Sequence, residues 1–160
     1  MLRTIRTILM LTILCTSSGC ALFVAGIDSV KQAGLTSGDR EMLLNQQMKD
    51  FHSSLFAGRV DAAMNYVDED LQSTLRPQLK KSFKTDKQTD HVIDNIDFED
   101  SSNQATVELT MKFFRNTDYL MKEQVVTEFW KFHLGGFWRL VGYQASEPST
   151  PGDRKSRDET

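Results

Sequence analysis

Two acidic residues are the candidates for acid–base chemistry, because the strand pattern places each of them in phase with apolar side chains. Asp94 alternates with Ile96 in one predicted strand, and Glu128 alternates with Trp130 in another. A carboxylate enclosed by apolar side chains has a raised pKa and can act as a general base. The alternative is that both carboxylates are solvated at the rim of the sheet, since both lie near strand ends. Carboxylates in such structural places are more common than perturbed catalytic ones.

The other residues that could carry chemistry show no pattern of a catalytic or metal site. His52, His91 and His133 are spread along the chain without the spacing of metal ligands. The sequence contains no serine–histidine–aspartate arrangement, glycine-rich phosphate loop or nucleophilic cysteine. The acidic residues between positions 86 and 100 lack the spacing of a calcium-binding loop. We therefore expect neither a metal nor a cofactor.

The most strongly patterned element is a predicted hairpin over residues 125–143, with a Gly-Gly turn. A two-residue glycine loop would set Phe132 opposite Arg139 and place a charge among aromatic side chains. A three-residue loop over residues 135–137 instead pairs Phe132 with Leu140. Because a slip of one residue turns one strand's side chains to the other face, the pattern favours the three-residue loop. Glycine also supplies the left-handed residue that such loops need.

This register predicts an inner face rich in aromatic residues and an outer face that is only partly polar. On the outer face Phe129 opposes Tyr143, and Val141 lies beside Lys131. A contiguous apolar patch rimmed by lysine and arginine is typical of a protein-contact surface. The predicted interface comprises Phe114, Phe129, Val141 and Tyr143.

The elements before the hairpin follow from apolar spacing. Helical spacing predicts an amphipathic helix over 40–57, a short helix over 60–67, and a third helix capped by Asp68 or Asp70 and kinked or restarted at Pro77. Residues 80–90 read as a charged connection. Alternation predicts strands over 92–98 and 105–114, a third strand leading to Val125 with a bulge at 124–126, and then the hairpin. Helices followed by antiparallel strands indicate an α+β fold, with the helices on one face of a four-stranded sheet.

The N-terminal residues have the layout of a secretory signal. Arg3 and Arg6 precede a short apolar stretch over 8–14, and small residues over 16–19 precede Cys20. The run Ser-Ser-Gly-Cys resembles the lipobox of bacterial lipoproteins, which implies a diacylglyceryl group on Cys20 and cleavage just before it. The alternative is a transmembrane anchor over 7–27, a stretch of 21 uncharged residues that the polar Thr-Ser-Ser-Gly run makes a poor helix. Ala21 after the cysteine resembles the outer-membrane sorting case.

Charge and composition bound the partners and the domains. Without residues 1–19, 17 basic residues stand against 22 acidic ones, a net charge of −5. Binding to nucleic-acid phosphates needs clustered lysine and arginine, so we expect no nucleic-acid partner. The predicted organisation is a signal peptide (1–19), a lipidated cysteine and tether (20–38), one α+β domain (39–144) and a disordered tail (145–160), which is rich in proline and charge.

Two stretches carry a resemblance to a known family. The chain resembles the nuclear transport factor two-like cone fold in the helical segment FHSSLFAGRVDAAMNYV, in the hairpin segment FWKFHLGGFWRLV and in the alternating strands between them. The resemblance covers residues 40–144 and is nearest to the domains of this kind in small bacterial lipoproteins of unknown function. The superfamily includes isomerases, dehydratases, cyclases and non-enzymatic binding modules, so the fold leaves the function open. The pocket that the resemblance implies would be lined by Tyr66, Asp94, Glu128, Trp130, Phe132 and Trp138.

These observations favour a lipid-anchored domain of the cell envelope, at the outer membrane and facing the periplasm, that acts as a non-catalytic binding or assembly module. The expected partners are the membrane, a second copy or another envelope protein, and a small apolar ligand. The alternative is an isomerase- or hydrolase-like enzyme that uses Asp94 and Glu128, since a perturbed carboxylate in a pocket is the mark of such a site.

Overall fold

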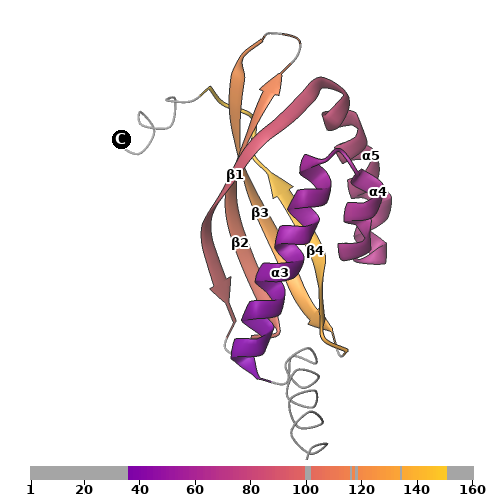
Figure 1. Cartoon of the computed structure of the whole chain (residues 1–160), viewed down its shortest axis with the longest axis vertical. Coiled ribbons are helices and arrows are strands. Elements are labelled where there is room, and N and C mark those ends of the chain that lie inside the picture. The colour runs from indigo at the N-terminus through magenta and orange to yellow at the C-terminus, as the bar shows by residue number, and fades with distance from the viewer. Residues whose placement is uncertain (1–35, 100–101, 116, 118, 134, 151–160) are drawn as a thin grey trace, which may run out of the picture.

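The computed structural model describes residues 36–99, 102–115, 117, 119–133 and 135–150. The predicted signal segment, Cys20 and nearly all of the predicted tether lie outside the described residues. Within these ranges, helices precede strands, as the sequence pattern predicts (Figure 1). No helix in them is long and apolar enough to cross a bilayer. In chain order the elements are α3 (Ser37–Phe56), α4 (Val60–Ala63), the 3-10 helix η1 (Met64–Tyr66), α5 (Glu69–Thr85), β1 (Asp86–Phe98), β2 (Gln104–Arg115), β3 (Met121–His133) and β4 (Phe137–Ala145).

Helix α3 begins at a capping box, three residues before the predicted start. The Asp39 backbone N–H donates to the Thr36 hydroxyl (3.2 Å), and the Thr36 backbone N–H donates to an Asp39 carboxylate oxygen (3.4 Å). This reciprocal pair satisfies N–H groups that have no partner within the helix. The helix carries an apolar stripe at helical spacing, which packs against the sheet. Its fully buried members include Leu44, Met48, Phe51 and Leu55.

Helix α5 runs through Pro77 to Thr85, so the prediction of a restart at Pro77 and of a connection over 80–90 was wrong. Leu75 and Leu79, one turn apart, are both buried and hold the helix against the core on either side of the proline. The chain then passes directly into β1 at Asp86. This residue pairs with Arg115 at the end of β2, and the Arg115 guanidinium donates to its carboxylate (3.0 Å).

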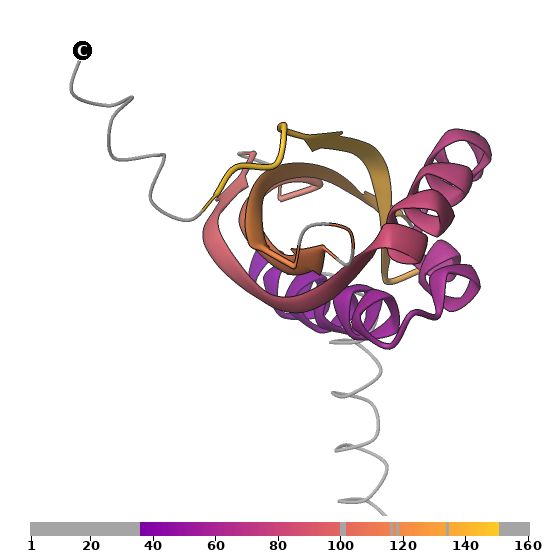
Figure 2. The same cartoon turned by 90° about the horizontal axis from the view of Figure 1, so that it is seen from above.

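The four strands form one antiparallel sheet in the order β1-β2-β3-β4. Figure 2 shows that the sheet is strongly curved, and Figure 1 that α3 runs along it with α4 and α5 beside it. The predicted bulge at 124–126 is absent, because β2 and β3 pair without interruption through these residues. Irregular pairing occurs instead in β1 and between β3 and β4.

The β3–β4 hairpin has the predicted three-residue loop, but one residue earlier, over 134–136. His133 pairs with Phe137 and Phe132 with Trp138, so the predicted pairing of Phe132 with Leu140 was wrong by two residues. Because a shift by two preserves side-chain phase, the aromatic residues still share the inner face. Both loop glycines, Gly135 (φ 114°) and Gly136 (φ 83°), have the left-handed backbone that other residues avoid. Leu134 lies outside the described residues.

A bulge at Val141 changes the face of the residues that follow it. Trp130 pairs with Leu140 whereas Phe129 pairs with Gly142, so Val141 is the extra residue on β4. Beyond the bulge Tyr143 pairs with Glu128 rather than with Phe129 and packs against the core. The prediction that Tyr143 faces outward was therefore wrong, because regular alternation does not continue through a bulge.

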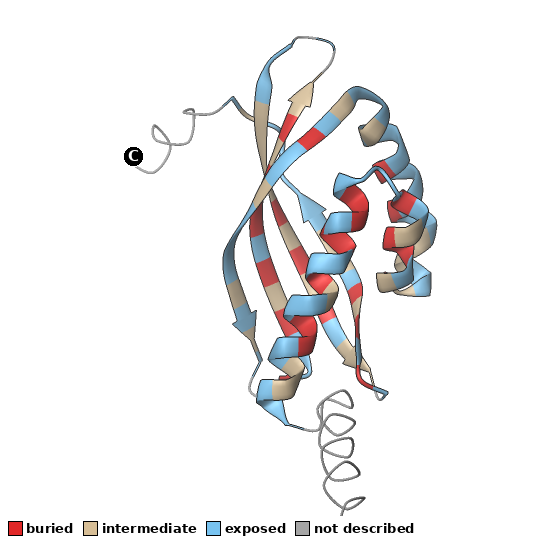
Figure 3. Ribbon diagram, in the orientation of Figure 1, coloured by how far each residue is buried: buried red, intermediate tan, exposed pale blue. Residues whose placement is uncertain are grey.

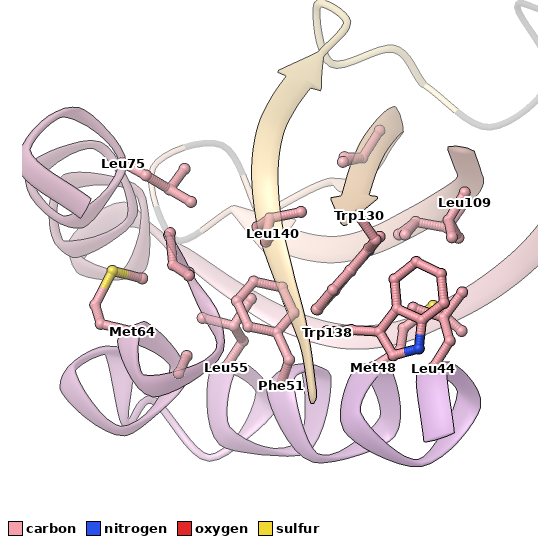
Figure 4. Packing of buried hydrophobic residues seen from close by; sticks show 14 of the residues in the cluster. Leu44, Met48, Phe51, Leu55, Met64, Leu75, Leu109, Trp130, Trp138 and Leu140 are labelled. Carbon is pink, nitrogen blue, oxygen red and sulfur yellow. The ribbon is translucent and has the colours of Figure 1, made fainter. Parts of the chain in front are cut away.

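The core lies between the helices and the inner face of the sheet. Buried residues follow one side of α3 and alternate along β2 and β3 (Figure 3). Trp130 meets Phe51 edge to face, with ring centroids 5.7 Å apart. Trp138 donates its indole N–H to the Arg40 carbonyl (2.9 Å), which fastens β4 to α3. The two indoles are 1% exposed and lie among Leu44, Met48, Leu109 and Leu140 (Figure 4).

The first residues of the predicted disordered tail pair with β3. Ala145 is the last residue of β4 and pairs with Val126. Glu123 and Ser149 then exchange two backbone hydrogen bonds of 2.8 Å each, so the chain continues along β3. Residues 151–160 lie outside the described residues.

Candidate functional site

Glu128 is sealed inside the domain, not solvated at the rim. Its side chain is 0% exposed, on the inner face of β3 between Val107 and Tyr143. The Trp130 indole N–H donates to Glu128 Oε2 (3.0 Å), and His52 Nε2 of α3 lies 3.3 Å from the same oxygen. The sequence correctly placed Glu128 on the inner face. Its place near a strand end did not predict burial, because α3 and the bulged end of β4 cover it.

The polar atoms of this cluster are only partly satisfied. Glu128 Oε1 and both ring nitrogens of His52 have no hydrogen-bond partner among the described residues. The 3.3 Å contact between His52 and Glu128 has the separation of an ion pair but not the alignment of a hydrogen bond. Such pairs recover only part of the cost of removing a charge from water. The cluster therefore costs stability unless a buried water completes it.

His91 connects this buried cluster to the surface. Its ring stacks on His52, with centroids 4.8 Å apart and planes 23° apart, and it is half-buried. Burial lowers the pKa of His91, and the neighbouring His52 lowers it further, while Asp90 and Glu128 act in the opposite direction. Burial, with the Glu128 charge as a second cause, raises the pKa of Tyr143. The Tyr143 hydroxyl therefore stays protonated at neutral pH, and it lies 3.6 Å from Met111 Sδ.

The structure separates the second predicted carboxylate from Glu128. Asp94 is exposed and accepts a hydrogen bond from the Thr110 hydroxyl (2.7 Å). Thr110 alternates along β2 with the core residues Leu109 and Met111, so it faces the outer side of the sheet. The prediction that Asp94 points inward was wrong, because the pairing of β1 with β2 is irregular between Ile93 and Asn95.

The remaining predicted pocket residues belong to packed structure. Trp130 and Trp138 are fully buried in the core. Phe132 meets Trp138 edge to face at 5.4 Å, with the Arg40 guanidinium 5.1 Å from its ring centre. Tyr66 is half-buried against the core. Within the described ranges, no three metal-ligating side chains come together.

A pocket that the sequence does not predict lies between the α3–α4 turn, α4 and α5. Its volume is about 400 Å³. Lys80 donates to Asp61 Oδ2 (2.8 Å), and this hydrogen bond lowers the pKa of Asp61. The basic residues that line the pocket are far apart along the chain, so the sequence offers no local signal for this pocket. The lining residues are Gly58, Arg59, Val60, Asp61, Ala62, Lys80, Phe83 and Lys84.

The outer sheet face keeps part of the predicted apolar patch and gains one residue. Phe129 lies across Gly142, where a Cβ atom would be 2.8 Å from the Phe129 ring. Val141 is 38% exposed and Phe137 37% exposed, and the Arg139 guanidinium stacks 5.1 Å from the Phe137 ring centre. Tyr143 does not belong to this face, because it packs against the core. We call Phe129, Phe137 and Val141 the outer patch.

Phe114 lies at the other end of the outer face. It is half-buried and meets Tyr119 edge to face, with ring centroids 6.1 Å apart. Tyr119, Leu120 and Met121 are all exposed around it. Phe114 pairs with Met121 at the far end of the β2–β3 ladder, whereas Phe129 pairs with Thr106 near its start. The predicted interface residues therefore fall into two apolar groups, not one patch.

No family model and no curated protein matches the chain. Several solved structures resemble it, and two of them are given below. One is a SEC-C motif containing protein from Rhodopseudomonas palustris, with a TM-score of 0.53 and 11% identity over 63% of this chain and 77% of that one. The other is a protein of unknown function with a cystatin-like fold from Nostoc punctiforme, with a TM-score of 0.54 and 18% identity over 73% and 97%. These likenesses concern the fold alone and confirm the α+β class, with helices on a curved four-stranded antiparallel sheet.

Proposed function

We propose that this chain is a lipid-anchored protein of the bacterial cell envelope, with a nuclear transport factor two-like domain that acts as a non-catalytic binding or assembly module. The signal layout and the lipobox-like run before Cys20 support the anchor. The outer membrane, facing the periplasm, is the location that Ala21 favours. In the part of the chain that the structure describes, the helices cover the inner side of the sheet and leave the outer face open to a partner (Figure 1 and Figure 2).

The observation that carries the proposal is the contrast between the outer patch and the groups suited to catalysis. Phe137 and Val141 remain more than a third exposed, beside the exposed Lys131. Exposed apolar side chains beside cations are typical of a protein-contact surface. Glu128, by comparison, is fully covered, although a general base must come within hydrogen-bond reach of its substrate. A second copy is the simplest partner, because one self-complementary face suffices for a twofold dimer. Another envelope protein is the other candidate.

The contact surface is tested by charge substitution in the membrane-anchored chain. Phe137→Lys combined with Val141→Lys should abolish cross-linked assemblies and leave a folded monomer. The matched control is Val92→Lys combined with Ile93→Lys, which adds the same charges at exposed apolar positions on β1. In-cell cross-linking, followed by native mass spectrometry, measures the assembly. If the parent chain is monomeric and captures no protein partner, the outer patch is not a contact surface.

The anchor is tested separately. Acyl chains bind a membrane with about 0.8 kcal/mol per buried methylene, so a multiply acylated cysteine holds a protein there essentially permanently. Cys20→Ala should prevent acylation and the lipoprotein type of cleavage. Processing of that variant to the same membrane-bound form would contradict the lipoprotein interpretation.

An isomerase- or hydrolase-like enzyme is the second candidate, and the cluster of Glu128 with His52 and Trp130 favours it. Such an activity would require α3 to move away, since His52 of that helix covers the carboxylate. Asp94 would take no part. Activity against isomerase and esterase substrates that disappears in Glu128→Gln, with the fold retained, would support this candidate over the binding module.

A further inference from the structure

The pocket between the α3–α4 turn, α4 and α5 has an excess of positive charge. Its lining contains three cations, Arg59, Lys80 and Lys84, and one carboxylate, Asp61, which leaves two positive charges at neutral pH. Asp61 is already paired, with Lys80 Nζ at 2.8 Å and Arg76 Nε at 3.8 Å. Asp61 is therefore engaged by Lys80 and Arg76, and it forms no ion pair with Arg59 or Lys84. The domain as a whole is acidic, so this concentration of cations is local.

The two remaining cations are held where they can meet a ligand. Gly58 has a left-handed backbone (φ 70°) and donates to the Leu55 carbonyl (2.8 Å), and the Arg59 N–H donates to Ser54 O (2.8 Å). These bonds fix the turn that carries Arg59. Lys84 extends from the last turn of α5 on the opposite wall. Both side chains are exposed, and neither forms an ion pair with a described acidic residue at 4 Å or less.

The floor of the pocket is apolar. Val60 is buried, Ala62 is half-buried, and the half-buried Phe83 ring packs against the core. A cation-rimmed pocket with such a floor suits a molecule with an acidic head and an apolar part, because each part meets its own kind of surface. The volume of about 400 Å³ falls within the range of about 300–1,000 Å³ that is usual for small-molecule sites.

We propose that this pocket binds an anionic amphiphile, with the acidic headgroup between Arg59 and Lys84 and the start of an acyl chain on Val60 and Phe83. A phosphate group is the shared chemistry of the two possible sources, a lipid headgroup and free phosphate. The apolar floor favours the lipid. This site is separate from the outer patch and does not depend on the contact proposed there.

The test is an affinity measurement on the full chain held in phosphatidylcholine nanodiscs. Three soluble probes separate the features of the ligand: dihexanoyl phosphatidylglycerol, dihexanoyl phosphatidylcholine and inorganic phosphate. We expect the phosphatidylglycerol probe to bind at least about tenfold more tightly than either of the others, because only it meets both the cations and the floor. Equal affinity for the two lipids, or for phosphate and phosphatidylglycerol, would overturn the proposal, as would no binding at millimolar concentration.

Charge reversal locates the site. Arg59→Glu combined with Lys84→Glu should weaken phosphatidylglycerol binding by at least about tenfold, because two attractive charges become repulsive. Lys81→Glu combined with Lys87→Glu makes the same change in net charge at exposed positions outside the pocket, and should keep the affinity within about twofold. Full binding in the first variant overturns the proposal. The first variant should leave cross-linking through the outer patch unchanged, which keeps the two proposals distinguishable.

Discussion

The domain contains two acid–base pairs whose surroundings differ. The Glu128–His52 pair is 0% and 1% exposed, with three polar atoms that lack hydrogen bonds. The Asp61–Lys80 pair is 67% and 49% exposed and forms a short hydrogen bond in contact with water. Water stabilises each ion of the exposed pair, whether or not the pair forms, so the pair itself contributes little. The buried polar groups depend entirely on their few neighbours. Burial therefore makes the first pair sensitive to the loss of one partner and inaccessible to ligands, whereas exposure leaves the second pair with little effect on stability.

The largest expected effect comes from breaking the buried cluster. Glu128→Ala removes the acceptor of the Trp130 indole N–H and leaves a cavity. The free energy of unfolding should fall by about 3–5 kcal/mol, as for other broken buried pairs. Urea denaturation measures it, with Asp61→Ala as the exposed counterpart, whose denaturation midpoint should not change. A similar loss in both variants would remove the distinction between the clusters.

Replacing the whole buried pair should have a smaller effect. Glu128→Leu combined with His52→Leu removes both poorly satisfied groups and fills their space with apolar side chains. Because burial of the two groups costs nearly as much as their attraction returns, the free energy of unfolding should stay within about 1 kcal/mol of the parent or rise. A loss as large as that of Glu128→Ala would mean that the polar contacts stabilise the fold by more than their burial costs.

A still smaller effect is expected from His91, where the cluster reaches the surface. Burial and the neighbouring His52 lower its pKa in the folded state below the usual 6.5. The unfolded chain therefore binds a proton more readily as the pH falls below about 6.5, and stability decreases with it. This contribution is complete above pH 6.5 and is lost on acidification.

His91→Gln removes the group without adding charge. The decline in thermal midpoint between pH 7 and pH 5 should then become shallower. The matched control is His133→Gln, which substitutes a second half-buried histidine, one that stacks on Phe137. A slope unchanged in His91→Gln would show that other groups set the acid sensitivity.

The sequence predicts the periodic features of this fold well. The helical spacing of Leu44, Met48 and Phe51 and the alternation of Val107 with Leu109 place their side chains correctly, because one buried face imposes a fixed period. Periodicity does not predict bulges and helix ends. The bulge at Val141 moved Tyr143 inward, and the irregularity beside Asp94 moved that residue outward. Each depends on pairing between strands, which the local pattern does not contain.

The candidate sites show the same limit. The alternation of its strand predicts that Glu128 faces inward. The sequence does not predict that His52 covers the carboxylate, because no local pattern connects the two residues. The spacing of His52 from Met48 and Leu55 on α3 was a usable signal that this histidine faces the core. The pocket of Arg59 and Lys84 forms only where α4 and α5 pack together, so no sequence motif predicts it.

The burial of Glu128 is tested most directly by hydrogen exchange of the Trp130 indole N–H, which donates to Glu128 in the core. If the cluster is sealed, as a non-catalytic module requires, this proton exchanges only when the domain unfolds. Its exchange free energy, measured by NMR, should then equal the global free energy of unfolding and decrease with urea at the same slope. Exchange at a much lower free energy that does not depend on urea would reveal local opening above Glu128. That result would contradict the sealed core and favour the enzyme.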